Sequence, residues 1–276
     1  MKHEFAALDA YEEVALSLAS AAMERIGERV VATDERSTKK DPSDWVTVVD
    51  VEVERIVREQ LAERFGDHVV IGEEFGASGE TAADSLVWYV DPIDGTTNFV
   101  HGLPWSSFSL CLADDEGLVL GVVADPHRRE VFSARRGGGA RCNGEPVRCR
   151  DEPTLVGAAV LAELAGVQCW PGMLEMLVGL SKHQCVSRIM GSSALSLASV
   201  GAGRCAAVVL AGWNPIDVGA GVLIAREAGA VILGGADAHP VLGADALSKE
   251  LLVAVAGPVA AELSQLLEGL ASARGE

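Results

Sequence analysis

Two aspartates with metal-binding potential, Asp91 and Asp94, follow an apolar segment and precede three residues suited to holding a phosphate. Carboxylates and a free carbonyl at the end of a strand are the hard oxygen ligands that Mg2+ prefers. Gly95, Thr96 and Thr97 offer unhindered backbone N–H groups and hydroxyls, which suit a phosphate. Metal and phosphate ligands in one short segment predict metal-assisted phosphoryl chemistry.

Further acids stand at the ends of other expected elements. Glu73 and Glu74 directly follow an apolar run, and Asp217 begins a helical pattern. Each has a simpler interpretation, since paired glutamates in loops are usually solvated and an acid in a first helical turn is stabilised by the helix dipole. Asp91 before a proline could likewise be a turn former. Only the combined pattern favours a functional site.

Hydrophobic periodicity predicts the elements that would position these side chains. We expect strands and helices to be mixed throughout, with mainly antiparallel strands before about residue 150 and strand–helix alternation after it, which indicates layered sheets and helices. The expected helices are 7–27, 44–65, 172–180, 192–200, 216–228 and 260–273. The expected strands are 69–71, 86–90, 108–112, 118–124, 155–161, 206–210, 230–233 and 251–254, with a hairpin over 135–143.

Composition narrows the class of protein. The chain has 276 residues and a formal net charge of -18. Such an acidic chain is a poor match for nucleic acid, whose binding needs Lys and Arg to displace counterions, or for an anionic membrane. No apolar run approaches the roughly 20 residues that span a bilayer.

The six cysteines form no C-x2-C pair, so a zinc site is not expected. The N-terminus lacks a signal-peptide pattern, which predicts a cytoplasmic, reducing location.

The block from Asp91 to Phe99 resembles the signature of the inositol monophosphatase family of magnesium-dependent, lithium-sensitive phosphatases. Supporting segments stand on both sides of this block, in the family's order, at 44–50, 71–74, 191–194, 217–221 and 227–229. The resemblance therefore covers essentially the whole chain. It implies an α+β or α/β fold, a layered αβαβα sandwich of the inositol monophosphatase / fructose-1,6-bisphosphatase type, and a homodimer. We expect an N-terminal half (1–148) with most metal ligands and a C-terminal half (149–276) with Asp217 and the substrate-side loop.

The resemblance also implies the metal ligands. Glu73, Asp91 and the Ile93 carbonyl would hold a first Mg2+, and Asp91, Asp94 and Asp217 a second. A third, weaker cation would lie near Glu73, and Li+ would inhibit.

The resemblance assigns the remaining roles around a metal-bound water. Glu73 or Glu74 with Thr96 would orient that water, supported from behind by Thr47 and Asp50. The phosphate and the rest of the substrate would contact Asp94, Gly95, Thr96, Thr97, Gly191, Ser192, Ser193 and Ala194. No Ser or Cys nucleophile is required.

Departures from the family pattern concern the substrate. Ile216 stands where the family usually has Trp. Ala206 and Leu210 stand where members that use inositol phosphates have Asp and Glu. Leucine cannot bond a ring hydroxyl, and the lost partner costs about 1–3 kcal/mol, so inositol 1-phosphate is expected to be a poor substrate.

Other side chains keep two interpretations. His101 could touch the site or cap a loop, and Lys39 and Lys40 could steer an anionic substrate or be merely solvated. Trp213 is expected in the core or at an interface.

The function expected is a Mg2+-dependent phosphomonoesterase acting on a small phosphorylated metabolite like inositol monophosphate. Histidinol phosphate, fructose 1,6-bisphosphate and a nucleotide such as 3′-phosphoadenosine 5′-phosphate are alternative substrates. A non-catalytic regulatory binding protein is the alternative of another class.

Overall fold

The computed structural model describes residues 2–27, 36–38, 45–82, 84–151, 153–234 and 251–272. Lys39, Lys40 and Asp44 lie outside these ranges. The helices are α1 (Lys2–Gly27), α2 (Val48–Arg64), α3 (Thr96–His101), α4 (Met173–Lys182), α5 (Ser193–Gly201), α6 (Pro215–Glu227) and α7 (Ala260–Ser272), with a 3-10 turn at Gly257–Val259. No helix in the described ranges is long and apolar enough to cross a membrane.

An eight-stranded sheet carries the first half of the chain, in the order β10-β9-β8-β7-β6-β5-β3-β4. Neighbouring strands are antiparallel except β3 and β5, which are parallel. The strands are β3 (Val69–Gly72), β4 (Gly76–Ala77), β5 (Val87–Asp94), β6 (Ser107–Asp114), β7 (Gly117–Asp125), β8 (Glu130–Arg135), β9 (Gly139–Cys142) and β10 (Glu145–Val147).

A five-stranded sheet follows, in the order β12-β11-β13-β15-β14. Its strands are β11 (Ala159–Ala162), β12 (Val186–Ile189), β13 (Ala207–Ala211), β14 (Ala230–Leu233) and β15 (Leu251–Ala256). Strands β1 (Arg36–Thr38) and β2 (Trp45–Thr47) form a separate two-stranded antiparallel sheet. The boundary expected at residue 148 therefore falls where one sheet ends and the next begins; whether each half is a domain stays a prediction.

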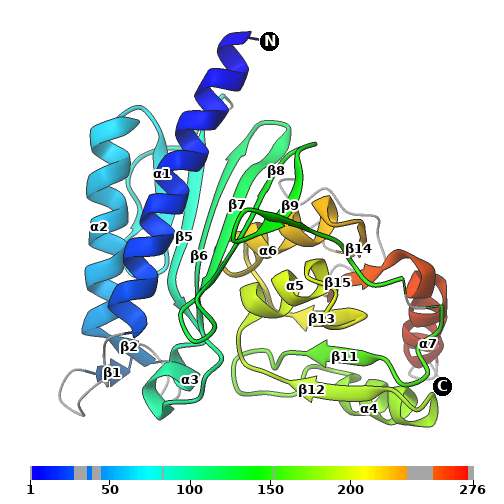
Figure 1. Ribbon diagram of the computed structural model, residues 1–276. Helices are drawn as coiled ribbons and strands as arrows, with labels where there is room; N and C mark the ends of the chain where they lie inside the picture. Colours follow the sequence, from blue (N-terminus) through cyan, green and yellow to red (C-terminus); the bar gives the residue numbers. More distant parts are fainter. Residues whose placement is uncertain are drawn as a thin grey trace.

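Five layers result (Figure 1). Helices α1 and α2 cover one face of the larger sheet, α5 and α6 lie between the two sheets, and α4 and α7 cover the outer face of the smaller sheet. Three clusters of buried apolar side chains fill the spaces between these layers. The expected αβαβα sandwich is confirmed.

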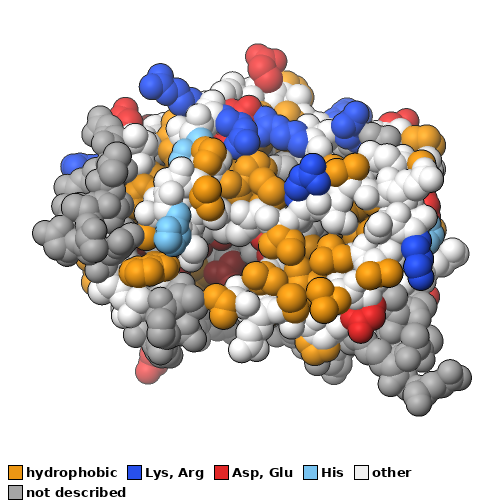
Figure 2. Space-filling view, turned by 90° about the horizontal axis from the view of Figure 1, so that it is seen from below, with side chains coloured by type: hydrophobic (Ala, Val, Ile, Leu, Met, Phe, Trp, Pro, Cys, Tyr) orange, Lys and Arg blue, Asp and Glu red, His pale blue; other side chains and the backbone are white. Residues whose placement is uncertain are grey.

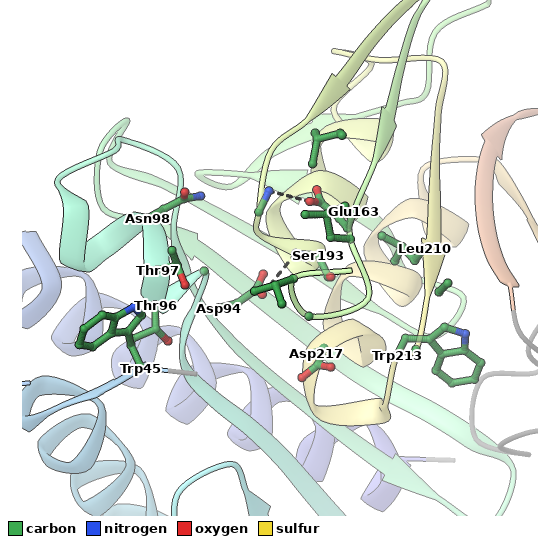
Figure 3. A pocket seen from close by; sticks show the side chains of 18 residues that line it. Trp45, Asp94, Thr96, Thr97, Asn98, Glu163, Ser193, Leu210, Trp213 and Asp217 are labelled. Carbon is green, nitrogen blue, oxygen red and sulfur yellow. Dashed lines mark hydrogen bonds between the residues drawn. The ribbon is translucent and has the colours of Figure 1, made fainter. Parts of the chain in front are cut away.

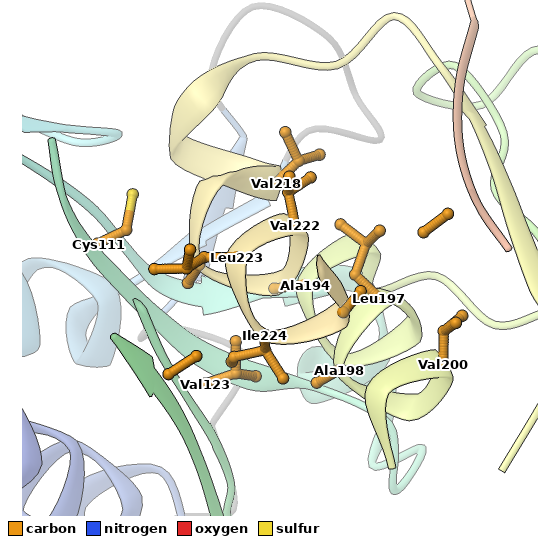
Figure 4. Close-up of a cluster of buried hydrophobic side chains, with 14 of the residues drawn as sticks. Cys111, Val123, Ala194, Leu197, Ala198, Val200, Val218, Val222, Leu223 and Ile224 are labelled. Carbon is orange, nitrogen blue, oxygen red and sulfur yellow. The ribbon is translucent and has the colours of Figure 1, made fainter. Parts of the chain in front are cut away.

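The middle layer depends on a close approach of α5 and α6, whose buried side chains are drawn in Figure 4. A Cβ at Gly221 of α6 would lie 2.5 Å from the Leu197 Cβ of α5, so a larger residue there would force the helices apart. The side chains of Ser192 and Asn214 cap the first turns of the two helices. Their first turns carry Ser193 and Asp217, so both are held on one rigid unit.

The structure changes several expected boundaries. The strand expected to end at Val90 continues through Asp94, because Asp94 pairs with Ser107 of β6 after a register shift. The helix expected from residue 44 begins at Val48, because Thr47 caps it and the residues before it form β2. Strand β12 was not predicted, since its residues are mostly exposed and give no apolar alternation.

Candidate active site

The end of strand β5 places two carboxylates inside the protein. Asp91 is 3% exposed and Asp94 is 8% exposed, and the pairing with β6 shifts register between them. Gly95 then turns the chain into α3 with a φ of 89°, a left-handed conformation that suits glycine. A Cβ at Gly95 would also lie 2.7 Å from the Gly191 carbonyl oxygen, so this turn requires glycine twice over.

The first turn of α5 holds Asp94. The Ser192 hydroxyl and the Ala194 N–H donate to Asp94 Oδ2 at 2.5 and 2.7 Å, and the Ser193 N–H donates to Oδ1 at 3.2 Å. Ser192 and Ala194 are buried and do not line the cavity described below, whereas Gly191 and Ser193 do. The expected substrate loop therefore acts here first as the support of an acidic side chain.

Thr47, Asp50 and Thr96 form a connected group. Asp50 Oδ2 accepts hydrogen bonds from the Thr47 N–H and hydroxyl at 2.8 and 2.5 Å, which caps α2. The Thr96 hydroxyl donates to the Ile93 carbonyl at 2.9 Å and lies 3.5 Å from Asp50 Oδ1. Thr96 is thus oriented from two sides at the start of α3.

A residue that the sequence analysis missed, Glu54, fixes the loop with Glu73 and Glu74. Glu54 on α2 is fully buried and accepts from the Glu74 and Phe75 N–H groups at 2.8 and 3.2 Å. The Arg58 guanidinium pairs with the same carboxylate at 2.8 Å. A Cβ at Gly72 would lie 2.0 Å from Glu54 Oε1, so a larger residue there would displace this carboxylate.

Burial and mutual repulsion raise the pKa of the acidic side chains. Burial raises the pKa of Asp91 well above its usual range, and the charges of Glu73, Asp94 and Asp217 raise it further. Burial also raises the pKa of Asp217 to about 7 and that of Asp94 to about 6. At Asp94, hydrogen bonds from the first turn of α5 oppose this rise. The four carboxylates therefore interact electrostatically with one another.

The acidic cluster fits a divalent cation. Asp91 Oδ1 is buried and accepts no hydrogen bond from the described residues, so it is free to bind one. The side-chain atoms available to bind a metal are all oxygens, which are the ligands that Mg2+ prefers. Within the described ranges no three His, Cys, Asp or Glu side chains are already arranged to hold a metal, so the carboxylates would have to draw together around it.

A cavity of about 400 Å3 opens beside the cluster (Figure 3). Asp94, Thr96 and Asp217 line one end of it. Figure 2 shows acidic side chains at the base of a hollow that hydrophobic side chains border. His101, at the end of α3, is exposed and outside the lining, whereas Trp213 packs against the core and also lines the cavity.

Glu163 is a second residue that was missed. It follows β11 directly, is 4% exposed and lines the cavity. Its carboxylate accepts from the Ser196 hydroxyl at 2.7 Å and the Gly191 N–H at 2.6 Å, and burial raises its pKa to about 7. An acid directly after an apolar strand, the same signal as at Asp91, could have found it.

Comparisons with known proteins identify a family and relatives of this chain. The sequence model of the inositol monophosphatase family matches residues 7–276. The chain is 38% identical over 232 residues to the inositol-1-monophosphatase SuhB of Mycobacterium tuberculosis, covering 79% of this chain and 80% of the relative. It is 35% identical to human inositol monophosphatase 2, covering 74% of each, and 36% identical to the Nus factor SuhB of Pasteurella multocida, covering 79% of this chain and 85% of the relative.

Solved structures give the same assignment. An IMPase from Thermotoga maritima superposes with a TM-score of 0.82 at 28% identity, covering 95% of this chain and 98% of the other. SuhB of Mycobacterium tuberculosis superposes with a TM-score of 0.75 at 33% identity, covering 95% and 97%. The architecture is therefore shared along nearly the whole chain.

Proposed function

The chain belongs to the inositol monophosphatase family, and on that premise we propose that this phosphatase is Mg2+-dependent and hydrolyses a small phosphate monoester. The observation that supports the proposal is the cluster of the buried Asp91 and Asp94 with the half-buried Asp217 beside a cavity, with an Asp91 oxygen that accepts no hydrogen bond from the described residues. Burying several carboxylates together is costly unless a cation balances them.

The ligands proposed for Mg2+ are Glu73, Asp91, the Ile93 carbonyl, Asp94 and Asp217. Bound Mg2+ would act as a Lewis acid on the phosphate and lower the pKa of an attacking water, with two to three ions per site and Li+ as an inhibitor.

The chain's own groups would orient the reactants. The Thr96 hydroxyl, fixed between Ile93 and Asp50, would orient the water together with Glu73 or Glu74. The Gly95 and Thr96 N–H groups would bind phosphate oxygens at the start of α3. Thr97, Gly191 and Ser193, which line the cavity, would contact the rest of the substrate.

The test is phosphate release, with and without Mg2+, from inositol 1-phosphate, fructose 1,6-bisphosphate, 3′-phosphoadenosine 5′-phosphate and histidinol phosphate. We expect Mg2+-dependent turnover of at least one ester, and its loss in Asp217→Asn, which removes one anionic ligand. Turnover that is equal without Mg2+, or retained in that variant at saturating Mg2+, would show that the metal assignment is wrong.

A second candidate function is non-catalytic binding, since the Pasteurella multocida relative is named a Nus factor. A protein that only binds a partner has no need to keep Glu73, Asp91, Asp94, Thr96 and Asp217 together, and this chain has them all. Folded protein that releases phosphate from no ester would favour this second function.

Two further expectations belong to the proposal. The absence of membrane-spanning helices in the described ranges and six free thiols are compatible with a cytoplasmic location, which fractionation of cells would test. The family resemblance supports a homodimer, which light scattering after size-exclusion chromatography would measure.

A further inference from the structure

The cavity has two chemically different ends. Asp94, Thr96 and Asp217 lie at the acidic end, where a phosphate and its cations would bind. Figure 3 shows Leu210 and Trp213 on the opposite side of Asp217 from Thr96. An ester whose phosphate occupies the acidic end would therefore direct its alcohol toward Leu210 and Trp213.

Apolar side chains from four separate segments make up this second end. Leu210 comes from β13, Ile189 from the end of β12, Trp213 from the loop before α6, and Leu164 and Val167 from the segment after β11. Val167 is 59% exposed and Ile189 is 48% exposed, although both side chains are apolar. Large apolar side chains gathered around a cavity mouth commonly mark a surface that a ligand covers.

The position of Val167 is fixed by backbone hydrogen bonds. Ala165 and Gln168 exchange them in both directions, at 3.0 and 3.2 Å, which holds Val167 at the tip of a tight turn. The apolar end therefore exists before a ligand arrives, and binding needs little reordering.

The additional hydroxyls of a polyol would find few hydrogen-bond partners at the apolar end of the cavity. The nearby carboxylate of Glu163 is partly engaged, since it accepts the Ser196 hydroxyl on one oxygen and the Gly191 N–H on the other. Leu210, Val167 and Ile189 offer no donor or acceptor. Each ring hydroxyl that loses its water without a replacement lowers binding by about tenfold.

We propose that the alcohol released by this enzyme carries an apolar, ring-sized body, so that the substrate is the phosphate monoester of an apolar or aromatic alcohol and not of a polyol. The proposal rests on the phosphatase function argued above and names the substrate class of the same site.

The test compares two alkyl esters with Mg2+ present: 2-phenylethyl phosphate and glycerol 2-phosphate. The hydroxyls of glycerol make it, if anything, the better leaving group, so faster hydrolysis of the phenylethyl ester reports binding. We expect its kcat/KM to be at least about tenfold higher, as differences in apolar contact allow.

Two variants of strand β12 locate the effect. Ile189→Ser should lower kcat/KM for the phenylethyl ester about three- to tenfold and leave that for glycerol 2-phosphate within about twofold. Val186→Ser is the matched control, because Val186 is 41% exposed on the same strand and outside the cavity lining. It should change neither value.

Binding without turnover separates this inference from the proposed function. Calorimetry with 3-phenylpropylphosphonate, whose C–P bond is not hydrolysed, should show binding at least about tenfold tighter than methylphosphonate, weakened by Ile189→Ser but not by Val186→Ser. Such binding without hydrolysis of any ester supports the preference of the cavity for an apolar ring and overturns the proposed function. Equal kcat/KM for the two esters, or equal binding of the two phosphonates, overturns the inference and leaves the phosphatase function standing.

Discussion

Replacing Glu54 by alanine is expected to destabilise the protein strongly and to weaken Mg2+ binding, although Glu54 touches neither metal nor substrate. The change leaves the Glu74 and Phe75 N–H groups without their acceptor and the Arg58 guanidinium without its carboxylate. Each orphaned donor costs about 1–3 kcal/mol, and breaking a buried ion pair from one side costs about 3–5 kcal/mol. Because these costs overlap, we expect a total of about 3–5 kcal/mol.

Urea unfolding and thermal melting measure this loss. At about 2–4 °C per kcal/mol for a chain of this size, the melting temperature should fall by about 10 °C. Glu59→Ala is the control, because Glu59 is an exposed acid on the same helix. A Glu54→Ala protein within about 1 kcal/mol of the wild type, with unchanged Mg2+ affinity, would refute the idea that this carboxylate holds the Glu73 loop.

Three further changes follow from the same contacts. Glu163→Gln can still accept from the Gly191 N–H and donate to the Ser196 hydroxyl oxygen, so its kcat/KM should fall less than about threefold. Glu163→Ala loses both hydrogen bonds and should lower kcat/KM about tenfold. Steady-state kinetics measures both values, and equal effects of the two variants would contradict the role of these hydrogen bonds. Gly95→Ala should cost at least about 1–2 kcal/mol in urea unfolding, because φ is positive there and the new Cβ meets the Gly191 carbonyl. Without Mg2+, the free energy of unfolding should fall as pH rises from about 4 to about 7. Asp50 and Asp217, with pKa values of about 7, keep protons in the folded state that the unfolded chain has released. Urea unfolding in EDTA at pH 5 and pH 8 measures this, and greater stability at pH 8 would contradict it.

The sequence predicts those parts of the site whose signals are local. Asp91 and Asp94 are readable because a buried strand, a proline and a glycine surround them within a few positions, and the layered fold follows from long periodic segments. Glu54 is not readable in this way, since the backbone N–H groups that it binds lie 20 and 21 residues away along the chain. A carboxylate on a helix looks solvated until the fold brings backbone donors to it.

The cavity's second end shows the same limit. Leu210 departs from the family pattern in the sequence itself. Val167 and Ile189, which line the same cavity, come from a turn and an edge strand that carry no periodic signal. Tertiary contact, and not local propensity, brings these apolar side chains together.

The most direct test of the account is the melting temperature of the wild type and of Asp91→Asn, each with EDTA and with Mg2+. If Asp91 is a buried metal ligand, the wild type should gain up to about 2.7 kcal/mol at a Mg2+ concentration a hundred times its Kd. Asp91→Asn should be the more stable of the two in EDTA, because a buried amide cannot ionise beside the neighbouring carboxylates, and should gain little from Mg2+. Asp67→Asn, which alters an acid with a 93% exposed side chain, should respond like the wild type. An Asp91→Asn protein that is less stable in EDTA and keeps the full Mg2+ response would contradict the central claim.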